Sequence, residues 1–172
     1  RISNSLLRNR GTGDNRVGID TGTGGTYYIF NNVIYNTSAT GTVSAGFDSY
    51  GAYSSYVYSN TISGFLYGVR SRNSSNVTVK NSAVFNNTDD FYNGATLTIS
   101  YSASDDGDGT NAVNISPGVT ESSDWANAFI DYANGNFHLL LGSVLINSGI
   151  DTSGEAAPLN FTTDIDGQTR SG

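Results

Sequence analysis

The chain of 172 residues has no cysteine and no methionine, and charged residues make up only 13% of it. Without cysteine there is no disulfide framework, no cysteine zinc site and no cysteine nucleophile. With 8 basic against 15 acidic residues the net charge is −7, which argues against a surface for nucleic acid. No apolar run approaches ~18 residues, so we expect no membrane insertion.

Uncharged polar residues are abundant, whereas charged residues are few. The chain has 23 serines, 18 threonines, 20 asparagines and 11 tyrosines. Apolar residues make up 37%, which with 21 glycines is the range of an ordinary globular protein. Because position 1 is not methionine, we expect a processed chain or a segment of a longer protein, and the repeats described next favour the segment.

An eight-residue motif recurs along the first two thirds of the chain. It reads β-branched, any, asparagine-like, any two, aliphatic, any, then Asn, Gly or Asp. Its copies begin at Ile2, Ile29, Val57, Val79 and Ile99. A second mark, a small residue followed by an apolar one, keeps phase with it at Gly18-Ile19, Gly46-Phe47, Gly68-Val69 and, more weakly, Asp90-Phe91. Repeats of 20 to 28 residues whose length varies in one loop are typical of a solenoid.

The repeat predicts an all-β protein, a right-handed parallel β-helix of about five coils followed by a C-terminal cap. Each unit holds two or three short β-rich runs, and helical periodicity is absent before residue 120. Parallel crossovers are almost always right-handed. Asparagine tolerates the left-handed backbone of coil corners, which explains the recurring Asn4, Asn31 and Asn81, and then Asn9, Asn36 and Asn86.

We expect two parts, the coils over residues 1–116 and a capping segment over 117–172. Trp125, Phe129, Phe137, Leu139 and Leu141 would cover the last coil. At the other end the chain starts in mid-motif, which would leave a strand edge open. We therefore expect further N-terminal coils or a partner over that edge.

The C-terminal quarter carries the motifs Gly135-Asn136-Phe137-His138-Leu139-Leu140 and Asp164-Ile165-Asp166-Gly167-Gln168-Thr169-Arg170. This tail resembles that of secreted or phage-encoded right-handed parallel β-helix proteins, which end in D-I-D-G-x-x-R. The resemblance covers the whole chain and is most specific over 124–170. It implies the fold, whereas its members include polysaccharide lyases, tailspike depolymerases and adhesins. Asn136 and Asn147 depart from the aspartates common at those positions.

The repeat register places Asp20, Asp48, Arg70 and Tyr92 in one outward column, with Gly22, Tyr50, Arg72 and Gly94 two positions on. Asp20 and Asp48 are candidate acid and base of glycoside hydrolysis. Arg70 and Arg72 are candidate ligands of a uronate carboxylate. The alternative is a solvated charge ladder without catalysis. Lys80 and His138, the sole lysine and histidine, are candidate lyase bases, with Lys80 outward on a different strand from Arg70 and Arg72.

Three further groups of residues are candidate binding sites. Tyr50, Tyr53, Tyr56 and Tyr92 would contact a glycan or a protein, because aromatic faces stack on sugars; packing is the alternative. Asp105, Asp106 and Asp108, with Asn111, form an oxygen-rich turn suited to calcium, or an ordinary aspartate–glycine loop. Asp164 and Asp166 form a similar turn. Six N-x-S/T sequons, as many as chance gives, stand at Asn36, Asn73, Asn76, Asn86, Asn114 and Asn160.

Few ionisable groups and many hydroxyl and amide groups favour an extracellular, cell-surface or virion-surface structural module. Such a module would be adhesive, like an adhesin or a phage tail fibre, binding a polysaccharide or glycan and self-assembling, for example as a trimer. The alternative is a polysaccharide-degrading enzyme, a lyase or an inverting glycoside hydrolase like a tailspike. Calcium is the one cofactor that the sequence suggests.

Overall fold

The computed structural model describes residues 1–9, 16–22, 24–37, 44–116, 118 and 124–170. Over these residues the protein is almost entirely β, with two parallel sheets and one short antiparallel pair. The segments 10–15 and 38–43, where the repeat predicts variable loops, and position 117, the predicted start of the cap, lie outside the described residues.

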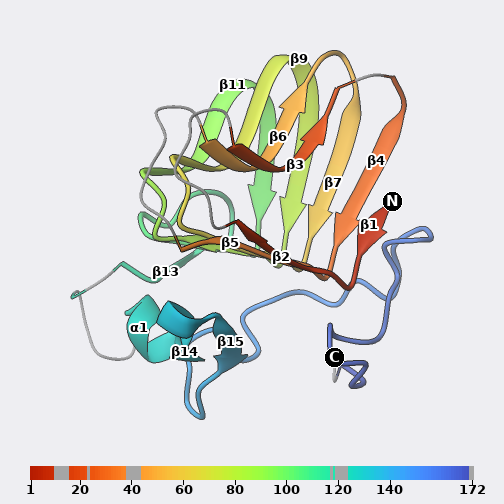
Figure 1. The fold of residues 1–172 in the computed structure, drawn as a ribbon. Helices are drawn as coiled ribbons and strands as arrows, with labels where there is room; N and C mark the ends of the chain where they lie inside the picture. Colours follow the sequence, from red (N-terminus) through yellow and green to blue (C-terminus); the bar gives the residue numbers. More distant parts are fainter. Residues whose placement is uncertain (10–15, 23, 38–43, 117, 119–123, 171–172) are drawn as a thin grey trace.

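Seven strands form a curled parallel sheet in the order β1-β4-β7-β9-β6-β3, with β11 pairing β9 (Figure 1). The two long strands β9 and β11 bend and thereby join its two halves. The bounds are β1 Ile2–Ser3, β3 Arg16–Thr21, β4 Thr26–Phe30, β6 Ser44–Tyr50, β7 Ser54–Tyr58, β9 Tyr67–Lys80 and β11 Asp89–Ser100.

A second parallel sheet has six strands in the order β13-β12-β10-β8-β5-β2. Their bounds are β2 Leu6–Asn9, β5 Val33–Asn36, β8 Thr61–Ser63, β10 Ala83–Phe85, β12 Ala103–Ser104 and β13 Val113–Asn114. After it come α1 (Trp125–Ala128), β14 (Phe129–Asp131), the 3₁₀ turn η1 (Tyr132–Asn134) and β15 (Asn136–Leu139), and β14 and β15 pair antiparallel.

The predicted repeat register is confirmed by the strand pairing. The motif anchors pair in order, Ile2 with Ile29, Ile29 with Val57, Val57 with Val79, and Val79 with Ile99. The second mark also pairs, since Ile19, Phe47, Val69 and Phe91 follow one another across β3, β6, β9 and β11. Most of these side chains meet Ile34, Ile62 and Val84 of the six-stranded sheet in one buried core.

The glycine of the second mark allows the two sheets to approach closely. A Cβ on Gly46 would overlap the Ile62 Cγ2 and lie 2.9 Å from the Gly68 carbonyl oxygen. Gly18 faces Ile34 and Gly68 faces Val84 in the same way. A small residue here is therefore required by the β-branched residue of the opposite sheet.

The predicted asparagine corners are confirmed at four of six positions, whereas Asn9 and Asn36 end strands β2 and β5 without a left-handed backbone. Asn4, Asn31, Asn81 and Asn86 have φ between 52° and 60°. The Asn31 side chain donates to the Asn4 side chain at 2.7 Å. A second ladder, which the sequence did not predict, stands one position later, where Asn32, Asn60, Ser82 and Ser102 accept backbone N–H groups of the preceding repeat.

The C-terminal quarter only partly matches the predicted cap. Trp125, Phe129 and Phe137 pack with Phe85 and Ile115 in a second core. The prediction for the two leucines is wrong, since Leu139 is 41% exposed and Leu141 is fully exposed. Beyond them the chain turns back along the corner of the sheets, toward the first repeat (Figure 1).

We call residues 140–170 the strap. Asn81 exchanges two hydrogen bonds with the Ile150 backbone, and Lys80 pairs with Glu155. Phe161 stacks on Phe30, and Arg170 donates to Asn31 and Ser59. Among the described residues, no backbone–backbone hydrogen bond joins the strap to either parallel sheet. The strap is therefore held by side chains.

Candidate functional site

The predicted column Asp20, Asp48, Arg70 and Tyr92 exists, because these residues pair across β3, β6, β9 and β11. The expectation of an open, outward ladder is wrong for its middle. Asp48 is fully buried and Arg70 is 6% exposed, while Asp20 lies in solvent. The two carboxylates therefore sit in different environments.

Two arginines enclose Asp48. Arg70 donates from Nε to Oδ1 at 3.1 Å and from Nη2 to Oδ2 at 2.6 Å, and Arg72 donates to the same two oxygens. Burial raises the pKa of Asp48, but the hydrogen bonds from Arg72 and Arg70 outweigh it and hold the pKa below its ordinary value. A carboxylate whose pKa is lowered and whose two oxygens are both engaged is a poor general acid or base. Asp48 is better explained as a structural counter-ion.

Rings cover the outside of this ion cluster. The Arg72 guanidinium carbon lies 4.6 Å from the centre of the Tyr50 ring, and that of Arg70 lies 5.1 Å from the Tyr67 ring. Tyr67 in turn contacts Tyr92, with ring centres 4.8 Å apart. A tyrosine ring therefore packs against each guanidinium group, although the Arg72 side chain is still 39% exposed.

The four tyrosines predicted to form one glycan-binding face are divided. Tyr50 and Tyr92 flank the arginines and are 46% and 39% exposed. Tyr53 packs edge-on against Tyr27, and Tyr56 stacks on Tyr28 at 5.6 Å. Each of the four therefore packs against a different neighbour, and no ring contact joins any two of them among the described residues.

The two predicted lyase bases lie far from Arg70. Lys80 belongs to the same strand as Arg70, so the expectation of separate strands is wrong, but it stands at the other end of β9. There it pairs with Glu155 and lies over the Tyr58 ring. His138 is exposed, with Nε2 2.9 Å from the Asp166 carboxylate and Nδ1 2.7 Å from Asn136.

The predicted calcium turn uses its carboxylates locally. Asp105 accepts the Asn86 N–H at 2.8 Å, while its other oxygen is buried without a hydrogen-bond partner. Burial, then a hydrogen bond and repulsion from Asp106, raise the pKa of Asp108 to about 6. Within the part of the chain that the structure describes, no three His, Cys, Asp or Glu side chains are placed to hold a metal ion. Asp164 accepts two backbone N–H groups of its own turn. Calcium binding stays a prediction.

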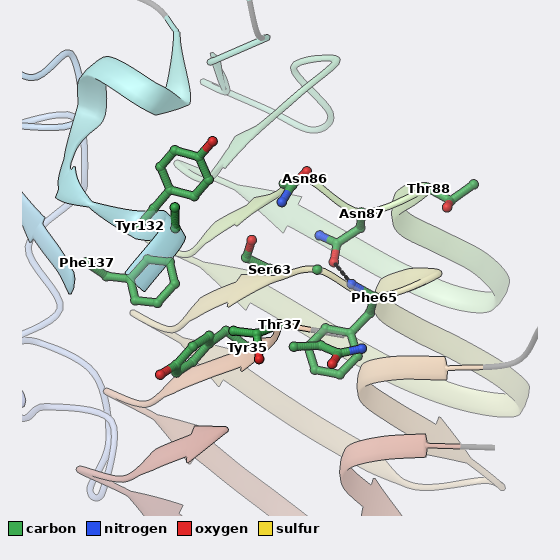
Figure 2. A pocket seen from close by; sticks show the side chains of 12 residues that line it. Tyr35, Thr37, Ser63, Phe65, Asn86, Asn87, Thr88, Tyr132 and Phe137 are labelled. Atoms are coloured by element: carbon green, nitrogen blue, oxygen red, sulfur yellow. Dashed lines mark hydrogen bonds between the residues drawn. The ribbon is translucent and has the colours of Figure 1, made fainter. Parts of the chain in front are cut away.

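The strongest candidate site was not predicted. A cavity of about 470 Å³ lies where β5, β8 and β10 end side by side, beneath the segment that joins β14 to β15 (Figure 2). The repeats contribute Tyr35, Asn36, Thr37, Ser63, Gly64, Phe65, Asn86, Asn87 and Thr88 to its lining, and Tyr132, Ala133 and Phe137 line one side (Figure 2). None of these twelve residues is an acid, a lysine, an arginine or a histidine.

One wall of the cavity is fixed by hydrogen bonds. The Asn87 side chain accepts the Phe65 N–H and donates to the Phe85 carbonyl and to the Asp90 carboxylate, each at 2.9 Å. Asp90 is buried, and its other oxygen accepts the Asp105 N–H at 2.7 Å. The neighbouring Asn86 and Thr88 are exposed and, with Ser63, supply polar groups to the cavity (Figure 2).

The aromatic side of the cavity is equally well supported. Phe137 meets Tyr35 edge-on at 5.2 Å and packs near Phe85 and Phe129. Burial, and then the charge of Asp124, raise the pKa of the Tyr132 phenol above its ordinary value. The sequence signal for this site was the last motif position of three repeats, Asn36, Gly64 and Asn86, two of which are polar; the aromatic residues Tyr132 and Phe137 lie outside the repeat.

Comparison with known proteins does not identify a function for this cavity. No protein-family model matches the chain, and neither a curated protein nor a solved structure matches it. A search of the described helices found none with the length and apolar character needed to cross a membrane.

Proposed function

We propose that the chain is a right-handed parallel β-helix module of an extracellular, cell-surface or virion-surface protein, and that it binds an uncharged glycan in the cavity above β5, β8 and β10. The in-register pairing of successive repeats supports the winding. The proposal that the cavity binds a glycan rests on the residues that line it.

The cavity offers what a neutral sugar requires. Its volume falls within the ~300–1,000 Å³ of small-molecule sites. Hydroxyl and amide groups of Ser63, Asn86 and Thr88 match sugar hydroxyls, which both donate and accept hydrogen bonds. The rings of Tyr132 and Phe137 offer apolar surface to the C–H face of a sugar ring. Because none of the described residues that line the cavity is charged, we expect an anionic sugar to bind there less well than a neutral one.

The decisive experiment is titration of the protein with neutral gluco-, galacto- and manno-oligosaccharides, followed by NMR. We expect binding of a neutral sugar to shift amide signals of residues 35–37, 63–65 and 86–88. Tyr132→Ala should weaken binding about fivefold or more, the equivalent of ~1 kcal/mol for one lost contact. Ser63→Ala should weaken it less.

The matched control is Tyr50→Ala, which removes an exposed tyrosine of the arginine cluster. This variant should bind as the unaltered protein does. If Tyr50→Ala abolishes binding and Tyr132→Ala leaves it intact, the cavity is the wrong site. Shortening of the oligosaccharide during the titration would favour the enzyme hypothesis over a binding module.

A further inference from the structure

The strand β11 has a free edge. It pairs with β9 over its whole length, and among the described residues the only pairing on its other side is one bridge, from Ser100 to Thr110. Residues 105–112, which follow β12, form no strand alongside the stretch of β11 from Phe91 to Thr98. The six-stranded sheet nevertheless continues by one more strand, β13. The two sheets therefore end at different levels, and the step exposes β11 (Figure 1).

The buried core is open at the same place. Val77 and Val79 of β9 are completely buried, whereas their neighbours on β11, Leu97 and Ile99, are only partly so. Tyr92, further along the edge, is 39% exposed. Another strand laid against β11 would cover these side chains as β11 itself covers those of β9.

The edge lacks the features that protect edge strands. Residues 91–100 contain no proline, no charged side chain and many β-favouring residues. Natural proteins usually place lysine, proline or a covering segment at such a position. A free, uncharged edge with alternating apolar side chains is the arrangement on which extended peptides add as an extra strand.

The charged side chains that flank this edge in the sequence are all acidic, whereas Arg70 and Arg72 of β9, which lie opposite Tyr92 and Gly94, are bound to Asp48. Exposed Asp89 begins β11, and Asp105, Asp106 and Asp108 follow β12, while Asp90 next to them is buried. These groups act on one another, since the charges of Asp105 and Asp106 raise the pKa of Asp90, after the larger effect of burial. No lysine or arginine occurs between residues 81 and 169. The complement of this surface is a basic strand.

We infer that the edge of β11 from Phe91 to Thr98 is a docking site for an extended segment of a partner protein that alternates basic and apolar residues. The segment adds to the seven-stranded sheet through main-chain hydrogen bonds. Its apolar side chains cover Leu97, and its basic side chains face the aspartates. The edge from Phe91 to Thr98 shares no residue with the lining of the glycan cavity, and the inference does not depend on glycan binding.

The test uses the whole chain and a synthetic peptide of about ten alternating lysine and valine residues, long enough to span the free edge. Amide hydrogen exchange of β11 is followed by NMR. Alternate amides between Phe91 and Thr98 should exchange fast in the free protein and at least about tenfold more slowly with peptide, because new hydrogen bonds protect them. Raising the salt from about 0.05 to about 0.5 M should weaken binding.

Controls separate strand addition from simple charge attraction. A peptide with glutamate in place of lysine, and a lysine–valine peptide with a central proline, should both fail to protect β11. Asp106→Asn, an exposed side chain at the edge, should weaken binding of the basic peptide, whereas Asp20→Asn, equally exposed on β3, should not.

Three results would overturn the inference. The first is no binding of the basic peptide, and the second is binding without protection of β11. The third is protection that grows with protein concentration and needs no peptide, which would make the occupant a second copy of this chain. None of these results bears on glycan binding, which is read from residues around the cavity.

Discussion

The buried carboxyl group of Asp90 should make the folded protein lose stability as the pH rises. Asp90 is 3% exposed, and it occupies in the fourth repeat the position that Gly18, Gly46 and Gly68 occupy in the first three. Burial raises its pKa from 3.8 to about 7, against hydrogen bonds from Asp105 and Asn87 that lower it. In the unfolded chain the same group ionises near its ordinary value of ~3.9.

The sign follows from proton linkage. Between about pH 4 and pH 7 the folded protein keeps a proton on Asp90 that the unfolded chain has lost, so each unit of pH lowers stability by up to ~1.4 kcal/mol. The full effect is present below pH 4 and is lost as the pH rises through about 7. From pH 4.5 to pH 7.5 the expected loss attributable to Asp90 is about 3 kcal/mol.

The assay is urea unfolding of the unaltered protein and of Asp90→Asn at four pH values across this range. The amide cannot ionise, so the difference between the two free energies of unfolding should change by about 3 kcal/mol. Constant effects of the substitution cancel in this comparison. A difference that stays within about 0.5 kcal/mol, or a carboxyl ¹³C titration midpoint of Asp90 near 4, would refute the reasoning.

Three further predictions concern packing and charge. Asp48→Ala should cost about 3–5 kcal/mol, because it leaves Arg70 and Arg72 without their counter-ion, whereas exposed Asp20→Ala should cost less than about 0.5 kcal/mol in the same unfolding assay. Gly46→Ala should destabilise by about 2 kcal/mol or more through overlap with Ile62, whereas Gly22→Ala meets nothing within 4 Å and should be nearly neutral. Arg170→Gln should accelerate hydrogen exchange in residues 160–170 while leaving the exchange of β7 and β9 unchanged, because it removes contacts of the strap alone.

Each of these outcomes can fail on its own. A loss below about 1 kcal/mol for Asp48→Ala would mean that the two guanidinium groups find water or other partners. An unchanged stability for Gly46→Ala would mean that the sheets separate at little cost. Uniformly faster exchange in Arg170→Gln would show that the strap and the sheets unfold together.

The register of the strands could be predicted from the sequence because it depends on a short-range rule. Side chains alternate between the two faces of a strand, and a one-residue slip would expose the whole apolar set. The anchors Ile29, Val57 and Val79 were therefore expected to pair across neighbouring strands, and the strand pairing confirms that they do. The requirement for glycine before Phe47 and Val69 follows from the same packing.

The burial of Asp48 could not be predicted in this way. The alternation rule correctly places Asp48 on the side of the sheet away from the core. It does not predict that two arginine side chains of the next strand fold back over Asp48 and bury it. The cavity escaped prediction for a related reason. Its floor lies at the ends of three repeats, but Tyr132 and Phe137 come from a segment without any periodic relation to them. Long-range docking of unlike segments leaves no periodic trace in a sequence.

The attachment of the strap by side chains also determines how the protein would respond to a pull on its C-terminus. Force applied there loads the contacts one after another, Arg170 first, then the Phe161 stack, then the Glu155 ion pair and the Asn81 hydrogen bonds. Each breaks alone, as in unzipping, so the strap should lengthen in small steps at low force. The parallel sheets would bear the load only after some thirty residues of slack had been released. The strap would thereby take up an extension of the C-terminus before the parallel sheets are loaded.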